Sequence, residues 1–297
     1  KCQRKMKQYV VSCLVLTGGI CEVSALQKRG HTQAAPILCD DLSSAEGSNT
    51  SAWFYDWNIE KGSFGNSGCG TDLALHPNAE YVPQFSTYWT LNPPMEDMNL
   101  TYVSTAKFVM GYNEPDHDGS IVPPEFAASQ WARMEELQDA FGFQVVSPCV
   151  ANYVEGREWL YEFQGNCSAL YGRPCKYDFV CVHAYYQPTA IESMMGMLEQ
   201  MYDDWKLPIW ITEFACPPYQ HCSAETQLEF MSAAVPLIDE LPYIYRYAWF
   251  ISRMVDEEKG GCVLLQGPLP NVTTPQRTPL GEWYNTFESL DNDESNW

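Results

Sequence analysis

The chain has 297 residues, of which 45% are hydrophobic and 14% aromatic. This length and composition favour one globular domain with a large core and argue against a disordered chain. The formal net charge is −21, so nucleic acids and anionic membranes would be repelled. A neutral substrate is compatible with this charge.

The first residues have the pattern of a secretory signal peptide. A basic start at 1–7 is followed by a short apolar stretch at 9–21 and by Ala25, a small residue of the kind found at signal cleavage sites. The apolar stretch is too short to span a bilayer. We predict that 1–29 is a signal peptide with a short pro-segment and that 30–297 forms one domain. The alternative for the start is an amphipathic first helix.

Asn-x-Ser/Thr sequons also indicate the secretory pathway, because asparagine-linked glycans are added there. We predict glycosylation at Asn49, Asn99, Asn166 and Asn271. The expected location of the protein is therefore extracellular, or in a cell wall.

The chain has 12 cysteines, which suits an oxidising compartment. Nine of them follow residue 29, so at least one is unpaired or pairs between chains. We expect small loop-closing disulfides between Cys167 and Cys175 and between Cys216 and Cys222. No Cys-x-x-Cys pair is present in the sequence, so we expect no thiolate metal site and no cofactor.

Short apolar runs that resemble strands alternate with longer mixed segments. The strand-like runs lie at 52–57, 80–85, 107–112, 144–148, 179–185, 208–212 and 245–250. Helical patterns lie between several of them, at 123–141, 190–205 and 223–241. This alternation predicts parallel βαβ units. Seven strand-like runs in one domain favour a single (β/α)8 TIM barrel over an open sheet, and no Gly-x-Gly-x-x-Gly follows a strand.

Two glutamates each follow an apolar strand-like run. Glu114 comes after 107–112, and Glu213 comes directly after 208–212. Residues at these ends of barrel strands lie on the rim where active sites are built. Pro115 is expected to hold Glu114 in an extended conformation. A retaining glycosidase needs two such carboxyl groups about 5–5.5 Å apart; the alternative is that both are ordinary rim carboxylates in ion pairs.

Four ordered motifs around these residues resemble glycoside hydrolase family 128. They are Gly-Tyr-Asn-Glu-Pro-Asp at 111–116, Val-His-Ala-Tyr-Tyr at 182–186, Ile-Trp-Ile-Thr-Glu-Phe-Ala at 209–215 and Thr-Pro-Leu-Gly-Glu-Trp-Tyr at 278–284. This family contains the alkali-sensitive-linkage-type proteins of fungi and plants, many of which are β-1,3-glucanases. The resemblance implies a secreted, retaining endo-β-1,3-glucanase with Glu114 as acid/base and Glu213 as nucleophile.

The resemblance also implies a set of substrate-binding residues. Asn113 would hold the sugar 2-hydroxyl, while His183, Tyr185 and Trp249 would line the pocket. Aromatic residues of the cleft could stack on sugar rings. We expect this role for Trp89 and Tyr55, whereas Trp53 and Trp57 are more readily explained as core residues.

The assigned roles make a demand on the pKa of Glu114. An acid must stay protonated at the working pH, so we expect burial and the charge of Glu213 to raise the pKa of Glu114. The rate should then have a bell-shaped pH profile, with an alkaline limb set by Glu114.

The first strand fits the family pattern poorly. Lys28-Arg29-Gly30 is followed by His-Thr-Gln-Ala-Ala-Pro rather than by an apolar run. Either the dibasic pair belongs to an imperfect first strand, or it is a processing site and the strand comes from 36–39.

Three other readings compete with the hydrolase. A metal site at Asp116-His117-Asp118 would need a sharply turned loop, and Ser67 lacks the sequence context of a serine hydrolase nucleophile. The stronger alternative is a secreted cell-wall protein that binds glucan without cleaving it. In either case we expect a monomer whose partner is a β-glucan.

Overall fold

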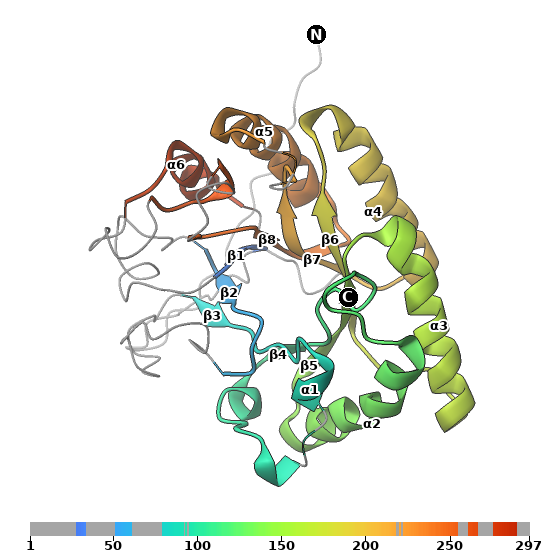
Figure 1. Ribbon diagram of the computed structural model, residues 1–297. Helices are drawn as coiled ribbons and strands as arrows, with labels where there is room; N and C mark the ends of the chain where they lie inside the picture. The colour runs from blue at the N-terminus through green and yellow to red at the C-terminus, as the bar shows by residue number, and fades with distance from the viewer. Residues whose placement is uncertain are drawn as a thin grey trace, which may run out of the picture.

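The computed structural model describes residues 28–33, 51–60, 79–91, 93, 95–217, 220, 222–254, 261–266 and 276–289. Within them, eight parallel strands form one curled sheet in the order β3-β2-β1-β8-β7-β6-β5-β4 (Figure 1). The strands are β1 Arg29–Thr32, β2 Trp53–Tyr55, β3 Glu80–Tyr81, β4 Phe108–Met110, β5 Gln144–Val150, β6 Phe179–Tyr185, β7 Ile209–Ala215 and β8 Ile244–Trp249.

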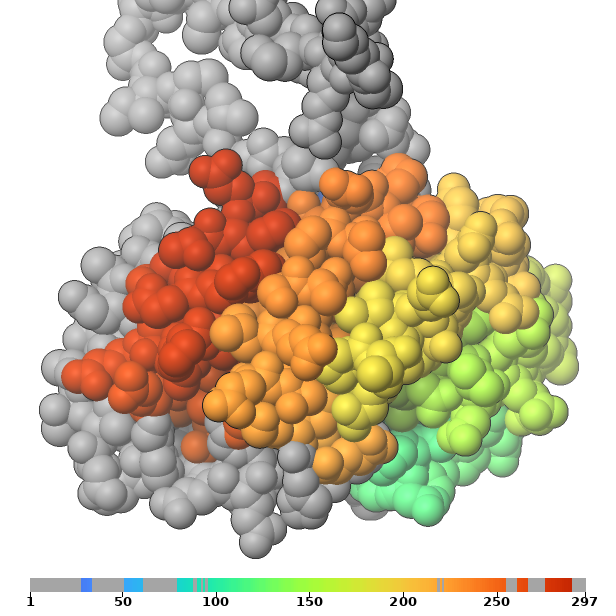
Figure 2. Space-filling model, turned by 90° about the horizontal axis from the view of Figure 1, so that it is seen from above, coloured from blue at the N-terminus to red at the C-terminus, as the bar shows by residue number. Residues whose placement is uncertain are grey.

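Helices cover the outside of this sheet. They are α1 Tyr88–Leu91, α2 Pro124–Phe141, α3 Tyr153–Tyr171, α4 Ile191–Trp205, α5 Ala224–Glu240 and α6 Pro279–Thr286, with short 3-10 turns η2 Met95–Asp97, η3 Val103–Thr105 and η4 Pro188–Ala190. Figure 2 shows α3 (lime green), α4 (yellow), α5 (orange) and α6 (red) following one another around the molecule. The predicted α/β fold of the TIM-barrel type is therefore present, and most of the segments after β1 and β2, at 34–50 and 61–78, lie outside the described residues.

The two edge strands of the sheet approach each other through the chain that follows β3. Gln84 forms a parallel bridge with Met110 of β4. The amide of Met110 donates to the carbonyl of Pro83 at 2.9 Å, and the amide of Phe85 donates to the carbonyl of Met110 at 3.0 Å. These bonds join the end of β3 to β4 and curl the sheet on itself.

Strand β1 is polar in sequence but completely buried between β2 and β8. The Arg29 guanidinium donates to the carbonyls of Tyr284, at 2.5 Å, and Phe287. Lys28 Nζ donates to the carbonyl of Asp239 at 2.7 Å. These partners satisfy the cations that the sequence places there, so Lys28 and Arg29 belong to the fold. The alternative strand at 36–39 lies outside the described residues.

Large side chains at the starts of the strands fill the lower half of the barrel. Phe108 and Phe179 pack edge to face, with ring centroids 5.6 Å apart, and Trp53 packs edge to face on Trp210 at 5.0 Å. The Arg246 guanidinium lies 4.6 Å from the centroid of Phe108. The prediction that Trp53 is a core residue is confirmed. With the lower half filled, the site can be built only at the opposite ends of the strands.

Three disulfides join described cysteines. The predicted pairs Cys167–Cys175 and Cys216–Cys222 are both present. A third bond, Cys149–Cys181, was not predicted because its cysteines are 32 residues apart. It crosslinks β5 and β6 directly.

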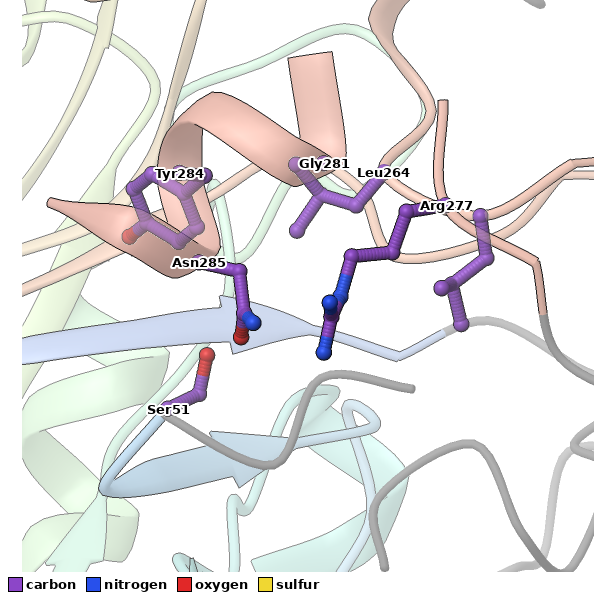
Figure 3. Close-up of a pocket in the computed structure, with 7 residues that line it drawn as sticks. Ser51, Leu264, Arg277, Gly281, Tyr284 and Asn285 are labelled. Atoms are coloured by element: carbon purple, nitrogen blue, oxygen red, sulfur yellow. The ribbon is translucent and has the colours of Figure 1, made fainter. Parts of the chain in front are cut away.

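A small space separates α6 from Ser51, which lies two residues before β2 (Figure 3). Its volume is about 10 Å³, too small for a sugar ring. It is lined by Ser51, Leu264, Leu265, Arg277, Gly281, Tyr284 and Asn285. Gly281 makes this packing possible, because a Cβ atom there would lie 2.0 Å from the carbonyl oxygen of Leu264.

Two of the predicted glycosylation sites can be located. Asn99 is exposed and precedes η3, whereas Asn166 is half-buried and lies within α3. Asn49, Asn271 and Ser67 lie outside the described residues. Among the helices that the structure describes, none has the length and apolar character needed to cross a membrane.

Candidate active site

Glu114 and Glu213 meet at the upper end of the barrel. Glu213 lies in β7, and Glu114 follows β4 in a turn. The φ of Glu114 is 45°, so the prediction of an extended conformation is wrong. The carbonyl of Glu114 accepts hydrogen bonds from the amide of His117 at 3.1 Å and from Ser120 Oγ at 2.7 Å. Pro115 disfavours the right-handed helical region for its neighbour, and this turn is made in the left-handed region instead.

His183 of β6 lies between the two carboxylates. Its Nδ1 is 2.8 Å from Glu114 Oε1 and 3.5 Å from Glu213 Oε2. One contacting atom from each of the three side chains lies within 4.8 Å of the others. The imidazole is fully buried, so it is held in place rather than free to rotate.

Three donors hold the carboxylate of Glu213, which is only 5% exposed. Tyr185 OH donates to Oε2 at 2.6 Å, while Trp57 Nε1 and Tyr55 OH donate to Oε1 at 2.8 and 3.3 Å. Hydrogen bonds to a charged carboxylate are among the stronger ones in proteins. Both oxygens are therefore held in fixed directions.

The turn of Trp57 is also strained, because its φ is 58°. A non-glycine residue in this region costs about 1–3 kcal/mol and is most often found at functional sites. Among the described residues the same conformation occurs at Glu114 and at Lys206, which ends α4. Two of these three residues line the same pocket.

The charges of the site depend on one another. Burial would raise the pKa of Glu114, but the hydrogen bond and charge of His183 outweigh burial and lower this pKa. Burial would lower the pKa of His183, but the carboxylates of Glu213 and Glu114 raise it above its usual value. The prediction of a raised pKa for Glu114 is wrong because it left out His183. The proton of the pair is held mainly by the imidazole.

The carboxylates open into a pocket of about 910 Å³. It is lined by Trp57, Asn113, Glu114, His117, Ala151, Asn152, Glu155, Tyr185, Tyr186, Glu213 and Phe250. Aromatic side chains and polar groups thus share one cavity of a size suited to an oligosaccharide segment.

A model of the family described as the glycosyl hydrolase catalytic core matches residues 34–284. The chain belongs to this family. The match spans both glutamates and the segments that carry His183, Tyr185 and Trp57.

Other comparisons agree with this glycosyl hydrolase assignment. Alkali-sensitive linkage protein 1 of Schizosaccharomyces pombe is 29% identical over 211 residues, which are 67% of this chain and 34% of that protein. The chain therefore spans about a third of the length of this relative.

Two solved structures show the same fold. One is an endo-β-1,3-glucanase of glycoside hydrolase family 128 from Pseudomonas viridiflava, with a TM-score of 0.69, 24% identity and coverage of 89% of this chain and 98% of that one. The other is an exo-β-1,3-glucanase of the same family from Cryptococcus neoformans, with a TM-score of 0.64, 24% identity and coverage of 86% and 97%. The resemblance to family 128 found in the motifs is thus confirmed.

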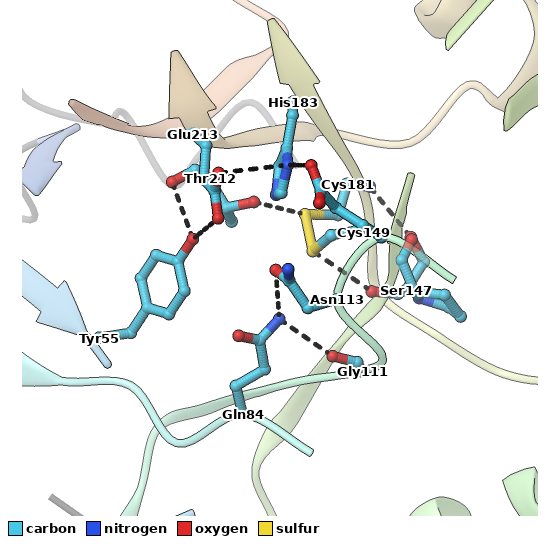
Figure 4. The surroundings of a disulfide bond; sticks show 12 residues. Tyr55, Gln84, Gly111, Asn113, Ser147, Cys149, Cys181, His183, Thr212 and Glu213 are labelled. Carbon is cyan, nitrogen blue, oxygen red and sulfur yellow. Dashed lines mark hydrogen bonds and ion pairs between the residues drawn. A yellow bond between two sulfur atoms is a disulfide. The ribbon is translucent and has the colours of Figure 1, made fainter. Parts of the chain in front are cut away.

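Most predicted binding residues of this glycosyl hydrolase gather around the glutamates. Tyr55, His183 and Tyr185 contact a carboxylate directly. Asn113 lines the pocket, and its Oδ1 accepts a hydrogen bond from Gln84 Nε2 at 3.4 Å. Figure 4 shows Tyr55, Asn113, His183 and Glu213 in the surroundings of the Cys149–Cys181 disulfide.

The prediction for Trp249 needs correction. Its side chain is fully buried, its Nε1 donates to the carbonyl of Cys262 at 2.8 Å, and its ring packs on Phe230 of α5 and Tyr284 of α6. It therefore lies on the outer face of β8, and the next residue, Phe250, lines the pocket. The side chain of Trp89, in α1, lies outside the described part, so its role stays a prediction.

Two pocket aromatics were missed. Trp57 was assigned to the core, yet it contacts Glu213, and Phe250 packs against both Trp57 and Tyr185 with ring centroids 6.3 and 5.7 Å away. A signal for Trp57 was present, because alternation along a strand places it on the same face as Tyr55.

The proposed metal site at Asp116-His117-Asp118 is not formed by the described residues. Asp116 Oδ1 accepts a hydrogen bond from the amide of Ala151 at 2.9 Å and so anchors the loop after Glu114. The described side chains close enough to share a cation are instead Glu114, His183 and Glu213.

Proposed function

We propose that this protein cleaves β-1,3-glucan with retention of configuration, with Glu213 as nucleophile and Glu114 as acid/base. The observation that carries the proposal is the close approach of the two carboxylates, whose contacting oxygens lie within 4.8 Å of each other. A retaining pair stands about 5–5.5 Å apart, whereas an inverting pair is separated by about 6.5–9.5 Å to admit a water molecule.

The proton for the leaving group comes from the His183–Glu114 pair. Moving it along the 2.8 Å hydrogen bond from Nδ1 to Oε1 gives a neutral imidazole and a protonated Glu114. Glu213 then attacks the anomeric carbon while Glu114 protonates the departing glycosidic oxygen. In the second step Glu114 takes a proton from water, which attacks the glycosyl ester and releases Glu213. After the second step the His183–Glu114 pair again holds one proton, as it did before the first step.

The choice of β-1,3-glucan rests on the relatives. The two solved structures described above are β-1,3-glucanases, one endo-acting and one exo-acting. The aromatic lining of Trp57, Tyr185, Tyr186 and Phe250 suits the apolar faces of glucosyl rings. We propose endo action, as the motif resemblance implies.

The proposed place of action is outside the cell, on a wall glucan. Three disulfides among the described cysteines support an oxidising compartment. A signal segment followed by one hydrolase domain is part of this proposal. We place the boundary predicted between residues 29 and 30 before Lys28 instead, because Arg29 lies in β1 and Lys28 Nζ donates to the carbonyl of Asp239.

The test uses linear β-1,3-, β-1,6- and β-1,4-glucans in parallel. We expect reducing ends to appear with the β-1,3-glucan, as a series of oligosaccharides rather than glucose alone, and proton NMR to detect the β-anomer of the new end first. The Glu213→Gln variant, of nearly the same shape, should release none. The α-anomer first would contradict retention. Binding to glucan without product from the wild type would instead identify a wall-binding protein.

A further inference from the structure

The Cys149–Cys181 disulfide lies close to the catalytic residues, with His183, Glu213 and Asn113 around it (Figure 4). Cys149 of β5 and Cys181 of β6 are register partners in neighbouring parallel strands, with Cα atoms 4.4 Å apart. Both are fully buried in the barrel interior, in the same cluster as Tyr55 and Met110. The strands are already hydrogen-bonded to each other, so this bond is not needed to pair them.

One half of the disulfide holds the segment that carries Glu114. The amide of Cys149 donates to the carbonyl of Tyr112 at 2.8 Å, and its carbonyl accepts from the amide of Glu114 at 2.8 Å. Asn113 forms a parallel bridge with Cys149 between these two bonds. The backbone of Cys149 therefore holds residues 112–114 in position, and the strained turn begins at Glu114.

The other half lies next to the residues that hold Glu213. Cys181 precedes His183 by two residues, so both side chains are on the same face of β6. Cys181 Sγ lies 3.2 Å from Thr212 Oγ1, and a disulfide sulfur has no hydrogen, so the hydroxyl donates. Thr212 immediately precedes Glu213 in β7.

We propose that the Cys149–Cys181 disulfide is a positioning element of the active site, which fixes the strand of Glu114 relative to those of His183 and Glu213. It links β5, whose backbone holds the Glu114 segment, to β6, which carries His183 and contacts Thr212 beside Glu213. This inference rests on the proposed function. The two other described disulfides differ, because Cys167–Cys175 and Cys216–Cys222 join cysteines only 8 and 6 residues apart.

The test compares Cys149→Ala/Cys181→Ala with Cys167→Ala/Cys175→Ala, which removes a disulfide that joins α3 to the loop after it rather than two strands of the barrel. A displacement of about 1 Å at a catalytic group can reduce turnover about 100-fold. We therefore expect kcat on β-1,3-glucan to fall about 10- to 100-fold in the first variant, with KM changed less than about twofold, and to be unchanged in the second. Equal kcat values, or equal losses in both variants, would overturn the proposal.

Two further measurements keep the test independent of folding yield and of the substrate. Thr212→Val keeps the disulfide but removes the hydroxyl contact, and a lowered kcat with unchanged KM is expected. If Cys149→Ala/Cys181→Ala does not fold, an unchanged kcat in Thr212→Val would overturn the proposal.

If the wild type cleaves none of the three glucans, the proposed function fails, and the NMR titration of His183 decides whether the disulfide positions the site. The raised pKa of His183 should fall in Thr212→Val and in the folded double variant, and an unchanged titration would overturn the proposal.

Discussion

Nδ1 of His183 lies 2.8 Å from Oε1 of Glu114, so the group assigned as acid and a buried imidazole share one proton. The pKa of His183 is raised by the charges of Glu213 and Glu114, which outweigh its burial, and the pKa of Glu114 is lowered by the same contact. Coupled groups titrate as a unit. The alkaline limb of activity therefore belongs to the pair and not to Glu114 alone.

Replacing His183 by asparagine should move this limb. Asn Nδ2 occupies the place of Nδ1 and can still donate to Glu114, but it cannot store a proton. Activity of the wild type is lost as the pH rises through the raised pKa of His183, whereas the variant must rely on a carboxyl group. We expect the alkaline limb of kcat/KM to move down by about one pH unit or more.

His117→Asn is the matched control for this change, because His117 also lines the pocket. The charge of His117 lowers the pKa of Glu114 less than His183 does, so the alkaline limb of His117→Asn should move far less than that of His183→Asn. If the alkaline limb of kcat/KM does not move in His183→Asn, the proton that sets this limb is held by Glu114 alone.

Azide should distinguish the roles of the two glutamates. With an activated β-glucoside as substrate, Glu213→Ala leaves space for azide on the face from which the nucleophile attacks, so the expected product is an α-glycosyl azide. Glu114→Ala still forms the glycosyl ester, and azide should then attack it from the other face to give the β-glycosyl azide. NMR of the products decides the assignment, and exchanged stereochemistry would reverse the roles of Glu114 and Glu213.

Trp57 is expected to contribute to turnover through its indole nitrogen. Trp57→Phe keeps a ring in the pocket but removes the 2.8 Å hydrogen bond to Glu213 Oε1. A hydrogen bond to a charged group contributes about 1.5–3 kcal/mol, and about 1.4 kcal/mol corresponds to a tenfold change in rate. We expect kcat to fall about tenfold or more, with a smaller change in KM.

Tyr185→Phe and Tyr186→Phe complete this comparison. Tyr185 OH donates to Glu213 at 2.6 Å, so its loss should lower kcat at least as much as the loss of the indole nitrogen. Tyr186 lines the same pocket, and its hydroxyl is not among the donors that hold Glu213, so kcat should be nearly unchanged in Tyr186→Phe. Equal effects of all three substitutions would argue against positioning of the nucleophile.

Local patterns were sufficient for much of the fold. The run at 179–185 coincides with β6. The helical segments at 123–141, 190–205 and 223–241 each correspond to a helix of the structure, and their ends differ from the helix ends by at most two residues. The helix α3 was missed although its N-cap has a recognisable pattern: Asn152 accepts from the amide of Glu155, three residues later. Segments with regular apolar spacing or clear caps need little tertiary information.

Other features depend on contacts between distant parts of the chain. Strand β1 can be buried because the carbonyls of Tyr284 and Asp239, more than 200 residues away, accept hydrogen bonds from Arg29 and from Lys28, which precedes the strand. Trp249 was assigned to the wrong face because β8 is buried on both sides, so alternation does not tell its faces apart. Both glutamates could be found from their strand ends, whereas the direction of the pKa shift of Glu114 required the position of His183.

His31 should make the stability of the protein depend on pH. It is fully buried in β1, with Nε2 3.1 Å from Gln33 Oε1 and its ring stacked on Phe54. Burial, with a smaller effect from the charge of Arg29, lowers the pKa of His31 to about 4. The unfolded chain has an ordinary histidine pKa of about 6.5 and binds the proton first as the pH falls.

This difference stabilises the folded state above about pH 6.5, and the stabilisation is lost as the pH falls from there to about 4. The full effect on the free energy of unfolding is about 3 kcal/mol. His31→Gln keeps a donor near Nε2 and cannot titrate, so its stability should decline less over this range. Denaturant unfolding at several pH values between 7 and 4 measures the difference, with His117→Gln, at an exposed position, as the control. Parallel declines in the wild type and in His31→Gln would show that other groups cause the loss.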